Sequence, residues 1–404
     1  MAIVTATSRR QGEAAKEGSR VVPFARPWLT KEDRAAAVRP IDRGWIGQGE
    51  EVAAFESEFA AFVGARHACA VSSCTGALHL ALLAVGTGPG DEVITASHSY
   101  IATANCVRYC GAKPVFVDIA PGSFNIDPLL IEEAITERTR AILCVHQMGM
   151  PCDLNAIVRI ARRNSLAIVE DAVCAVGSEI EWKGNWERIG RPHGDIACFS
   201  FHPRKLMATG DGGMITTSNG DWDHICRLCR QHGMNIADTV RHNANEVAFE
   251  SYPVLGFNYR MTDIHAALGR SQLKRIPEMV ERRRALAGRY CALLSDVPGL
   301  RLPNEPAWGR TNWQSYCVRL SDDCDQGRVM QFLLDRGVAT RRGVMCAHRE
   351  RVYADASDPV MLCESEAAQD GCILLPMFHE LLEEDQEYVC QNLGEACQVV
   401  STRT

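Results

Sequence analysis

The sequence LAIVED at residues 166–171 predicts a short buried strand that ends on an acidic residue, Asp171. Further along, IACFSF at residues 196–201 predicts a second buried strand, and Lys205 follows it just before the glycine cluster GDGG at residues 210–213. Short apolar runs bounded by turns are typical of strands inside a parallel sheet. Because the carboxyl ends of parallel strands meet at one crevice, we expect Asp171 and Lys205 to face the same ligand.

Working outward, short apolar runs alternate with amphipathic stretches from about Glu56 to Ser218, which predicts βα units with helices on both faces of a mainly parallel sheet. Strands are expected over residues 92–95, 114–118, 141–146, 167–171, 196–201 and 214–217, and helices over 74–85, 101–110, 128–135 and 154–164. A long helix-like stretch over 262–294 is expected to lead into a strand over 313–320 and helices over 326–336 and 383–393.

The sequence therefore predicts an α/β protein with three parts. A loose polar tail is expected over residues 1–20, a large domain with a mainly parallel sheet over 21–265, and a smaller α+β domain over 266–404. The chain of 404 residues is long enough for such a two-domain enzyme.

Composition argues against several classes of function. The net charge of −7 and 23% charged residues give no reason to expect nucleic acid as a partner. The polar first twenty residues lack a secretory signal and no apolar run approaches the roughly 20 residues of a membrane span, so a cytoplasmic protein without a membrane anchor is expected. The 18 cysteines are scattered, and only Cys226 and Cys229 have ligand-like spacing, so no metal is expected.

Three features of the sequence indicate catalytic or cofactor-binding chemistry. Lys205, at the mouth of the sheet, is placed to capture an aldehyde, and Asp171 is placed to keep a pyridine nitrogen protonated. The small polar residues at 72–77 open a helix whose free amides form a phosphate seat, to which Ser200 adds a hydroxyl. Each feature alone has a plainer interpretation: a solvated lysine, an aspartate that caps a turn, and an ordinary helix cap.

Taken together, these segments resemble a known family. The stretches GQG at 47–49, residues 71–80, GDEVI at 90–94, residues 169–177, residues 194–205 and GFNYRMTD at 256–263 are similar to those of the DegT/StrS nucleotide-sugar aminotransferases. Members of that family are enzymes of fold type I that depend on pyridoxal 5′-phosphate (PLP). The likeness runs from about Trp28 to Leu393.

The resemblance implies roles for individual residues. Lys205 would hold PLP as a Schiff base and then move the proton, and Asp171 would pair with the ring nitrogen. Other implied contacts are a ring stack by Tyr100, a phosphate site from the amides of Cys74 and Thr75 with Ser200, and a phosphate contact from the neighbouring subunit of a homodimer by Asn258 or Arg260. The sequence departs from the family at Cys174, where many relatives have Gln or His, and at Cys74 and Asp211, where Gly and Glu are usual.

Near the expected substrate end, Arg341 and Arg342 occupy a region where many relatives carry a His-Tyr pair. Two adjacent guanidinium groups could bind a diphosphate or a carboxylate, and they could equally be exposed loop charges. His348 and Trp313 are further candidates for substrate contact, with ordinary packing as the alternative.

The predicted function is transfer of an amino group from an amino acid, glutamate or glutamine, to a keto sugar carried on a nucleotide diphosphate. One alternative is an aminotransferase for a cyclitol or another non-nucleotide ketone. Another is a regulatory protein that keeps the PLP fold without turnover. Dehydratase relatives replace the lysine by histidine, whereas Lys205 is present.

Overall fold

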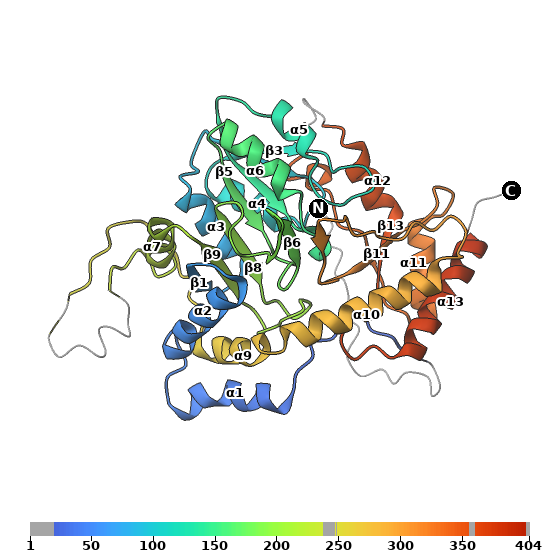
Figure 1. Ribbon diagram of the computed structural model, residues 1–404, viewed down its shortest axis with the longest axis horizontal. Helices are drawn as coiled ribbons and strands as arrows, with labels where there is room; N and C mark the ends of the chain where they lie inside the picture. Colours follow the sequence, from blue (N-terminus) through green and yellow to red (C-terminus); the bar gives the residue numbers. More distant parts are fainter. Residues whose placement is uncertain (1–19, 237–246, 248, 355–359, 401–404) are drawn as a thin grey trace, which may run out of the picture.

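The computed structural model describes residues 20–236, 247, 249–354 and 360–400 (Figure 1). The tail expected over residues 1–20 therefore lies outside the described residues except for Arg20, whose guanidinium bonds to Asp385 at 2.7 Å. Figure 1 shows a central sheet covered by helices, with a long helix leading away from it to the C-terminal elements.

A seven-stranded sheet forms the centre of the molecule, in the order β1-β9-β8-β5-β4-β2-β3. The strands are β1 (His67–Val71), β2 (Glu92–Ala96), β3 (Lys113–Val117), β4 (Thr139–Val145), β5 (Ala167–Asp171), β8 (Ile196–Ser200) and β9 (Gly213–Thr217). The pairs from β3 through β8 are parallel, and β9 runs antiparallel to both of its neighbours. The six expected strands are confirmed. β1 was not expected, because its sequence HACAV lacks a run of β-branched residues.

Helices cover both faces of this sheet. They are α2 (Glu50–Val63), α3 (Cys74–Ala84), α4 (Ala102–Tyr109), α5 (Pro128–Glu133), α6 (Leu154–Arg163) and α7 (Gly220–Cys229). The first helix, α1 (Lys31–Asp42), packs instead on α9 (Asp263–Leu273). Along β4, Ile142 belongs to the same buried apolar cluster as Phe55 of α2, whereas Leu143 belongs to a separate cluster with Leu78 of α3. This alternation is the period of two that places successive strand side chains on opposite faces.

The stretch expected to be one helix over 262–294 is two helices, α9 (Asp263–Leu273) and α10 (Ile276–Leu294). The prediction of a continuous helix was wrong because Pro277 lies in the first turn of α10. Proline is well tolerated at the start of a helix but cannot continue one, since it has no N–H to donate. In Figure 1, α10 runs along the lower side of the molecule towards the C-terminal elements.

The C-terminal elements pack around a second core. A three-stranded sheet, in the order β11-β13-β12, combines β11 (Tyr316–Arg319), β12 (Arg341–Arg342) and β13 (Cys372–Leu375) with α11 (Gln326–Asp335), α12 (Cys363–Gly371) and α13 (Glu383–Val400). Val22 pairs with Val338 and lies in the same core, so the beginning of the described chain crosses to this side. β11 is shorter than expected, because Trp313 has φ 50 and leaves the extended conformation.

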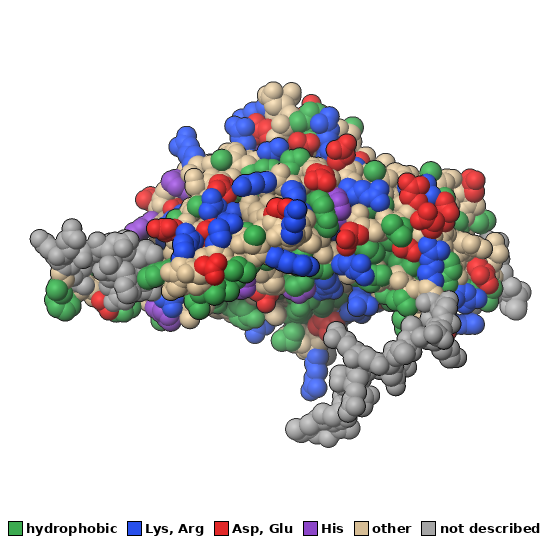
Figure 2. Space-filling view, turned by 90° about the horizontal axis from the view of Figure 1, so that it is seen from below, with side chains coloured by type: hydrophobic (Ala, Val, Ile, Leu, Met, Phe, Trp, Pro, Cys, Tyr) green, Lys and Arg blue, Asp and Glu red, His purple; other side chains and the backbone are tan. Residues whose placement is uncertain are grey.

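A small third sheet was not expected from the sequence. It contains β6 (Glu179–Trp182), β7 (Asn185–Arg188) and β10 (Gly309–Arg310). Two short 3-10 helices lie elsewhere: η1 (Gln147–Gly149) follows β4, and η2 (Ala347–Arg349) lies between β12 and α12. None of the helices in the described ranges is both long and apolar enough to cross a bilayer. Acidic and basic side chains are intermingled on the face shown in Figure 2.

Candidate active site

Asp171 ends β5 at the centre of the sheet and is only 2% exposed. The hydroxyl of Thr103 donates to its Oδ2 at 2.9 Å, and the backbone N–H of Val173 donates to its Oδ1 at 3.2 Å. Burial raises the pKa of the Asp171 carboxyl above its usual value, although Thr103, Val173 and Lys205 act in the opposite direction. The carboxylate is thus desolvated without full compensation, and a cationic partner would stabilise it.

Lys205 follows β8 and reaches the same crevice. Its Nζ lies 3.1 Å from the sulfur of Cys174, three residues beyond Asp171, and its charge is close enough to affect the Asp171 carboxyl. The turn that carries Lys205 is fixed by Gln314, which accepts from the Leu206 N–H at 2.8 Å and donates to the Arg204 carbonyl at 2.7 Å. The structure therefore brings Asp171, Cys174 and Lys205 together.

The amino end of α3 lies beside this crevice. Ser73 is the N-cap, and its hydroxyl accepts from the Gly76 N–H at 3.1 Å. The amides at the start of a helix have no partner within the helix, so those of Cys74 and Thr75 are available to an anion. Gly213 packs against this turn so closely that an added Cβ would lie 2.7 Å from the Ser73 carbonyl oxygen.

Two further predicted residues lie at the carboxyl ends of β8 and β2. Ser200 ends β8 and is buried, and its hydroxyl accepts from the His202 N–H at 3.3 Å. Tyr100 follows β2 and is 65% exposed, so its ring is free to cover a bound cofactor. Cys74, in the first turn of α3, has a neutral thiol. Burial raises the pKa of this thiol well above its usual value, and the nearby charge of Asp171 raises it further.

The segment with Asn258 and Arg260 runs past the same turn. The Tyr259 carbonyl accepts from the Ser72 N–H at 2.8 Å, and Arg260 forms a bridge with Val71. The ring of Tyr259 packs against α3, whereas Asn258 is exposed. The segment thus lies next to the phosphate seat of its own chain while Asn258 points to solvent.

The expected substrate residues are more widely spread. Arg341 and Arg342 are exposed neighbours on β12, so their side chains point to opposite faces of the strand. Trp313 is 8% exposed and lines a cavity of about 360 Å³ together with Phe124 and Trp308. His348 is partly buried, with protein partners on both ring nitrogens.

Sequence analysis missed a buried hydrogen-bonded pair next to Asp171. His146 Nε2 lies 3.0 Å from Glu170 Oε2, both side chains are 0% exposed, and Glu170 also accepts from the Gly194 N–H at 2.7 Å. The Cys152 N–H donates to His146 Nδ1 at 3.0 Å, so the imidazole proton lies on Nε2 and is donated to Glu170. This pair ties the end of β4 to that of β5, where Asp171 lies.

The two cysteines with ligand-like spacing lie in the core. Their thiols donate to backbone carbonyls, from Cys226 to Leu80 and from Cys229 to Leu255, both at 3.8 Å. Within the described ranges, no group of three or more His, Cys, Asp or Glu side chains is arranged to hold a metal ion.

Comparison with known proteins decides the family. The model of the DegT/DnrJ/EryC1/StrS aminotransferase family matches residues 27–394. The chain belongs to this family. It is similar to GDP-perosamine synthase of Caulobacter vibrioides, with 39% identity over 380 residues that cover 93% of this chain and 98% of the relative. It also resembles the spore coat polysaccharide biosynthesis protein SpsC of Bacillus subtilis, with 40% identity over 301 residues that cover 74% of this chain and 76% of SpsC.

Solved structures agree with the family assignment. The S. venezuelae protein DesV matches with a TM-score of 0.84 and 34% identity, covering 94% of this chain and 99% of DesV. The aminotransferase TlmJ from Streptoalloteichus hindustanus matches with a TM-score of 0.86 and 31% identity, covering 95% of this chain and 100% of TlmJ. The expected fold type I is confirmed, and the chain is a PLP-dependent aminotransferase.

The crevice fits PLP on its own chemistry. PLP needs an amine for its aldehyde, a carboxylate for its protonated ring nitrogen and a seat for its phosphate. Lys205 offers the amine, the desolvated Asp171 offers the carboxylate, and the first turn of α3 offers free amides.

Proposed function

We propose that the crevice holds PLP in a defined orientation. Lys205 bonds to the aldehyde carbon, Asp171 pairs with the ring nitrogen, and Tyr100 covers the exposed face of the ring. The amides of Cys74 and Thr75 with the Ser200 hydroxyl bind the phosphate. The observation that carries this proposal is the convergence of a desolvated carboxylate, an amine and a helix amino end at one edge of the sheet.

When bound, PLP supplies an electron sink for the pair of electrons left at the donor's Cα. The negative charge of Asp171 keeps the ring nitrogen protonated, and the Thr103 and Val173 donors keep that carboxylate in place. With PLP bound, the Lys205 amine would hold the aldehyde and, once displaced by the donor amine, would be the base that takes the proton from the donor's Cα. The Lys205 Nζ donates to the Cys174 sulfur at 3.1 Å, and because sulfur is a weak acceptor this bond holds the amine only loosely.

The proposed reaction moves an amino group from glutamate or glutamine to the ketone of a sugar carried on a nucleotide diphosphate. Relatives support this substrate class, since one of them is a GDP-perosamine synthase. Trp313 and either Arg341 or Arg342 are proposed contacts of the acceptor. We place the enzyme in the cytoplasm and divide it into a large domain over 21–265 and a small domain over 266–404.

We also propose that two chains share each site, with Asn258 or Arg260 contacting the phosphate in the neighbouring subunit. Large apolar side chains directly precede this segment and are exposed, including Phe249 at 86% and Leu255 at 85%. Exposed apolar patches of this kind mark interaction surfaces. A second copy of the chain would cover them while bringing Asn258 towards its partner's crevice.

The proposed reaction is tested by loading the protein with pyridoxamine phosphate and adding keto compounds one at a time. We expect the absorbance of the PLP form to return with a nucleotide-linked keto sugar. Return only with a keto cyclitol would identify the alternative acceptor class. No change with any ketone, together with no change of the PLP form on adding glutamate or glutamine, would favour a regulatory protein without turnover.

A further inference from the structure

His348 lies in a chain of side-chain hydrogen bonds that joins the C-terminal elements to the central sheet. Its Nδ1 is 2.6 Å from the hydroxyl of Ser97, and its backbone N–H donates to the same hydroxyl at 3.0 Å. Its Nε2 is 3.1 Å from Glu366 Oε1 in the first turn of α12. Ser97 directly follows β2, so His348 connects α12 to the carboxyl end of that strand.

The direction of these bonds follows from the partners. Burial opposes ionisation of Glu366, but the Leu362 amide, His348 and Arg349 lower the pKa of its carboxyl, so Glu366 accepts. The Nε2 of His348 therefore carries a proton and donates to Glu366. In the neutral ring Nδ1 is left to accept from the Ser97 hydroxyl, whose oxygen accepts the His348 backbone N–H. Both ring nitrogens of His348 and the hydroxyl of Ser97 thus have hydrogen-bond partners.

The same three residue types, Ser, His and Glu, form the catalytic triad of some hydrolases. Ser97 is 0% exposed, so its oxygen has no access to a substrate. The arrangement is therefore not a nucleophilic site.

The Ser97 end of the chain leads directly to the cofactor crevice. Two residues later, the Ser99 hydroxyl lies 2.7 Å from the hydroxyl of Thr103, which donates to Asp171 at 2.9 Å. Because Thr103 uses its proton on Asp171, Ser99 must donate to Thr103. Tyr100, which is proposed to cover the ring, lies between these residues. The segment 97–103 thus carries both the ring cover and a donor to the essential carboxylate.

Further contacts join the region around His348 and α12 to the ends of β2 and β3. The Ala347 N–H donates to the Ser97 carbonyl at 2.9 Å, and His98 forms a bridge with Cys346. Asp118, just after β3, accepts from the Ser365 N–H at 2.8 Å and from its hydroxyl at 2.6 Å. Among these contacts the His348 side chain is the one that bonds to a side chain of segment 97–103.

We propose that His348 is a positioning residue of the aminotransferase: held by Glu366, it fixes Ser97 and thereby the segment 97–103 against the cofactor. This role replaces substrate contact as the function of His348. The proposal rests on the proposed PLP site for its effect on cofactor binding. The fixed conformation of segment 97–103 does not depend on that site.

The test compares substitutions of His348 that each replace only one of the two ring nitrogens by an amide. In His348→Asn the amide lies near the position of Nδ1 and retains the bond to Ser97, whereas in His348→Gln it lies near Nε2 and retains only the bond to Glu366. We expect PLP to bind to His348→Asn within about twofold of wild type, and to His348→Gln and His348→Ala about tenfold more weakly, as for one lost hydrogen bond. Ser97→Ala should bind PLP at least as weakly, because it also removes the bond from the His348 backbone N–H. The double variant Ser97→Ala, His348→Ala should bind no more weakly than Ser97→Ala alone, because Ser97→Ala already removes the bond to the His348 side chain.

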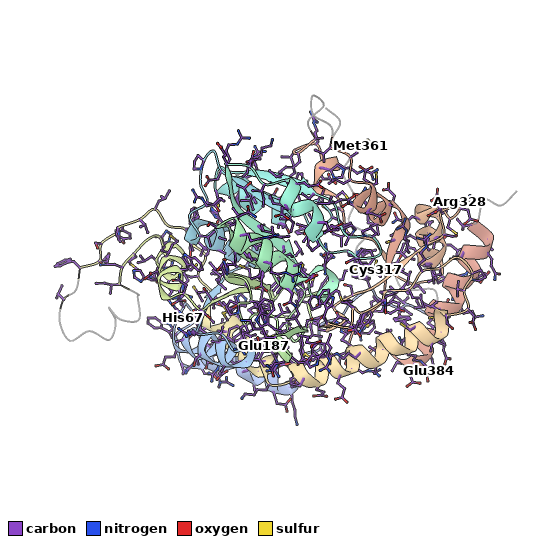
Figure 3. All side chains as sticks on the ribbon, turned by 45° about the horizontal axis from the view of Figure 1, so that its top comes forward. His67, Glu187, Cys317, Arg328, Met361 and Glu384 are labelled. Carbon is purple, nitrogen blue, oxygen red and sulfur yellow. The ribbon has the colours of Figure 1, made fainter. Side chains whose placement is uncertain are left out.

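Two further measurements separate positioning from general damage. Hydrogen exchange of segment 97–103, measured on the cofactor-free protein, should be faster in His348→Ala and Ser97→Ala, and the circular dichroism of bound PLP should be smaller. His67→Gln is the matched control: His67 is a partly exposed histidine 3.9 Å from Asp223, and Figure 3 shows it far from Met361, just before α12. It should change neither measurement.

Several results would overturn the proposal. These are unchanged exchange and PLP affinity in His348→Ala, additive losses in the double variant, or loss of affinity in His348→Asn with retention in His348→Gln. A wild-type chain that took up no PLP would instead refute the proposed function. In that case the exchange of segment 97–103 in the cofactor-free protein would still decide whether His348 holds it.

Discussion

Replacing Asp171 with Asn separates the catalytic charge of this residue from its structural bonds. The amide has nearly the same size, its oxygen can still accept from Val173, and the Thr103 hydroxyl can turn to accept from the new NH₂ group. What the substitution removes is the negative charge next to the proposed ring nitrogen. We therefore expect a folded protein that binds PLP but transfers the amino group slowly.

The substitution is expected to have two effects of opposite sign, one on the reaction rate and one on the stability of the cofactor-free protein. A charge-assisted bond that strengthens as charge develops in the transition state is worth about 3 kcal/mol, or a rate loss of roughly a hundredfold. In the cofactor-free protein the effect is opposite. Because burial raises the pKa of Asp171 above that of the unfolded chain, near 3.9, the folded state loses stability as pH rises above this value. Removing the charge removes that loss.

Two measurements on the same protein test this reasoning. The half-reaction with glutamate is followed in a single turnover, and the melting temperature of the cofactor-free protein is measured at pH 7. We expect the rate to fall about a hundredfold and the melting temperature to stay level or rise. Asp127→Asn is the control, since Asp127 caps α5 and Asn caps equally well. An unchanged rate, or a slow variant that also melts early, would refute the assignment.

Three other predictions follow from the same geometry. Lys205→Ala should abolish the absorbance of covalently held PLP and all turnover while keeping the melting curve, and wild-type absorbance in this variant would contradict the assignment. Glu170→Gln should destabilise the fold by about 1–3 kcal/mol in urea, because the single amide oxygen cannot accept from both His146 Nε2 and the Gly194 N–H and one buried donor is left without a partner; an unchanged midpoint of unfolding would contradict this role. A mixed dimer of a Lys205→Ala chain and a chain with Asn258→Ala and Arg260→Ala should regain about half of wild-type activity if the phosphate contact comes from the partner, since one site then collects both lesions; an inactive, properly assembled mixed dimer would exclude a shared site.

Much of the crevice could be predicted because its main groups follow local signals. Asp171 and Lys205 each come after a short apolar run, and the carboxyl ends of such strands meet in a parallel sheet. The amino end of α3 is marked by the small polar residues before an apolar helix face, with Ser73 as its cap. These features depend on a few neighbouring residues, and the structure brings them together as expected.

The supporting residues could not be predicted, because their partners lie far away in the chain. Thr103 is 68 positions from Asp171, Gln314 is 108 positions from Leu206, and the sequence around each shows only an ordinary polar side chain. The wrong prediction of one helix over 262–294 had a local cause instead. There the helical spacing of apolar residues outweighed the single proline at the start of α10.

The position of these supports links the C-terminal elements to the cofactor. Gln314 holds the turn with Lys205 on one side of the crevice, and His348 holds Ser97, 251 positions away in sequence, on the other. Both come from the part of the chain that follows α10, while the groups proposed to touch PLP come from the central sheet. Because a ligand stabilises the conformation to which it binds, PLP that binds between these two supported segments also stabilises the docking of the C-terminal elements. Docking of those elements in turn favours PLP by the same free energy, since the coupling between two such equilibria is reciprocal.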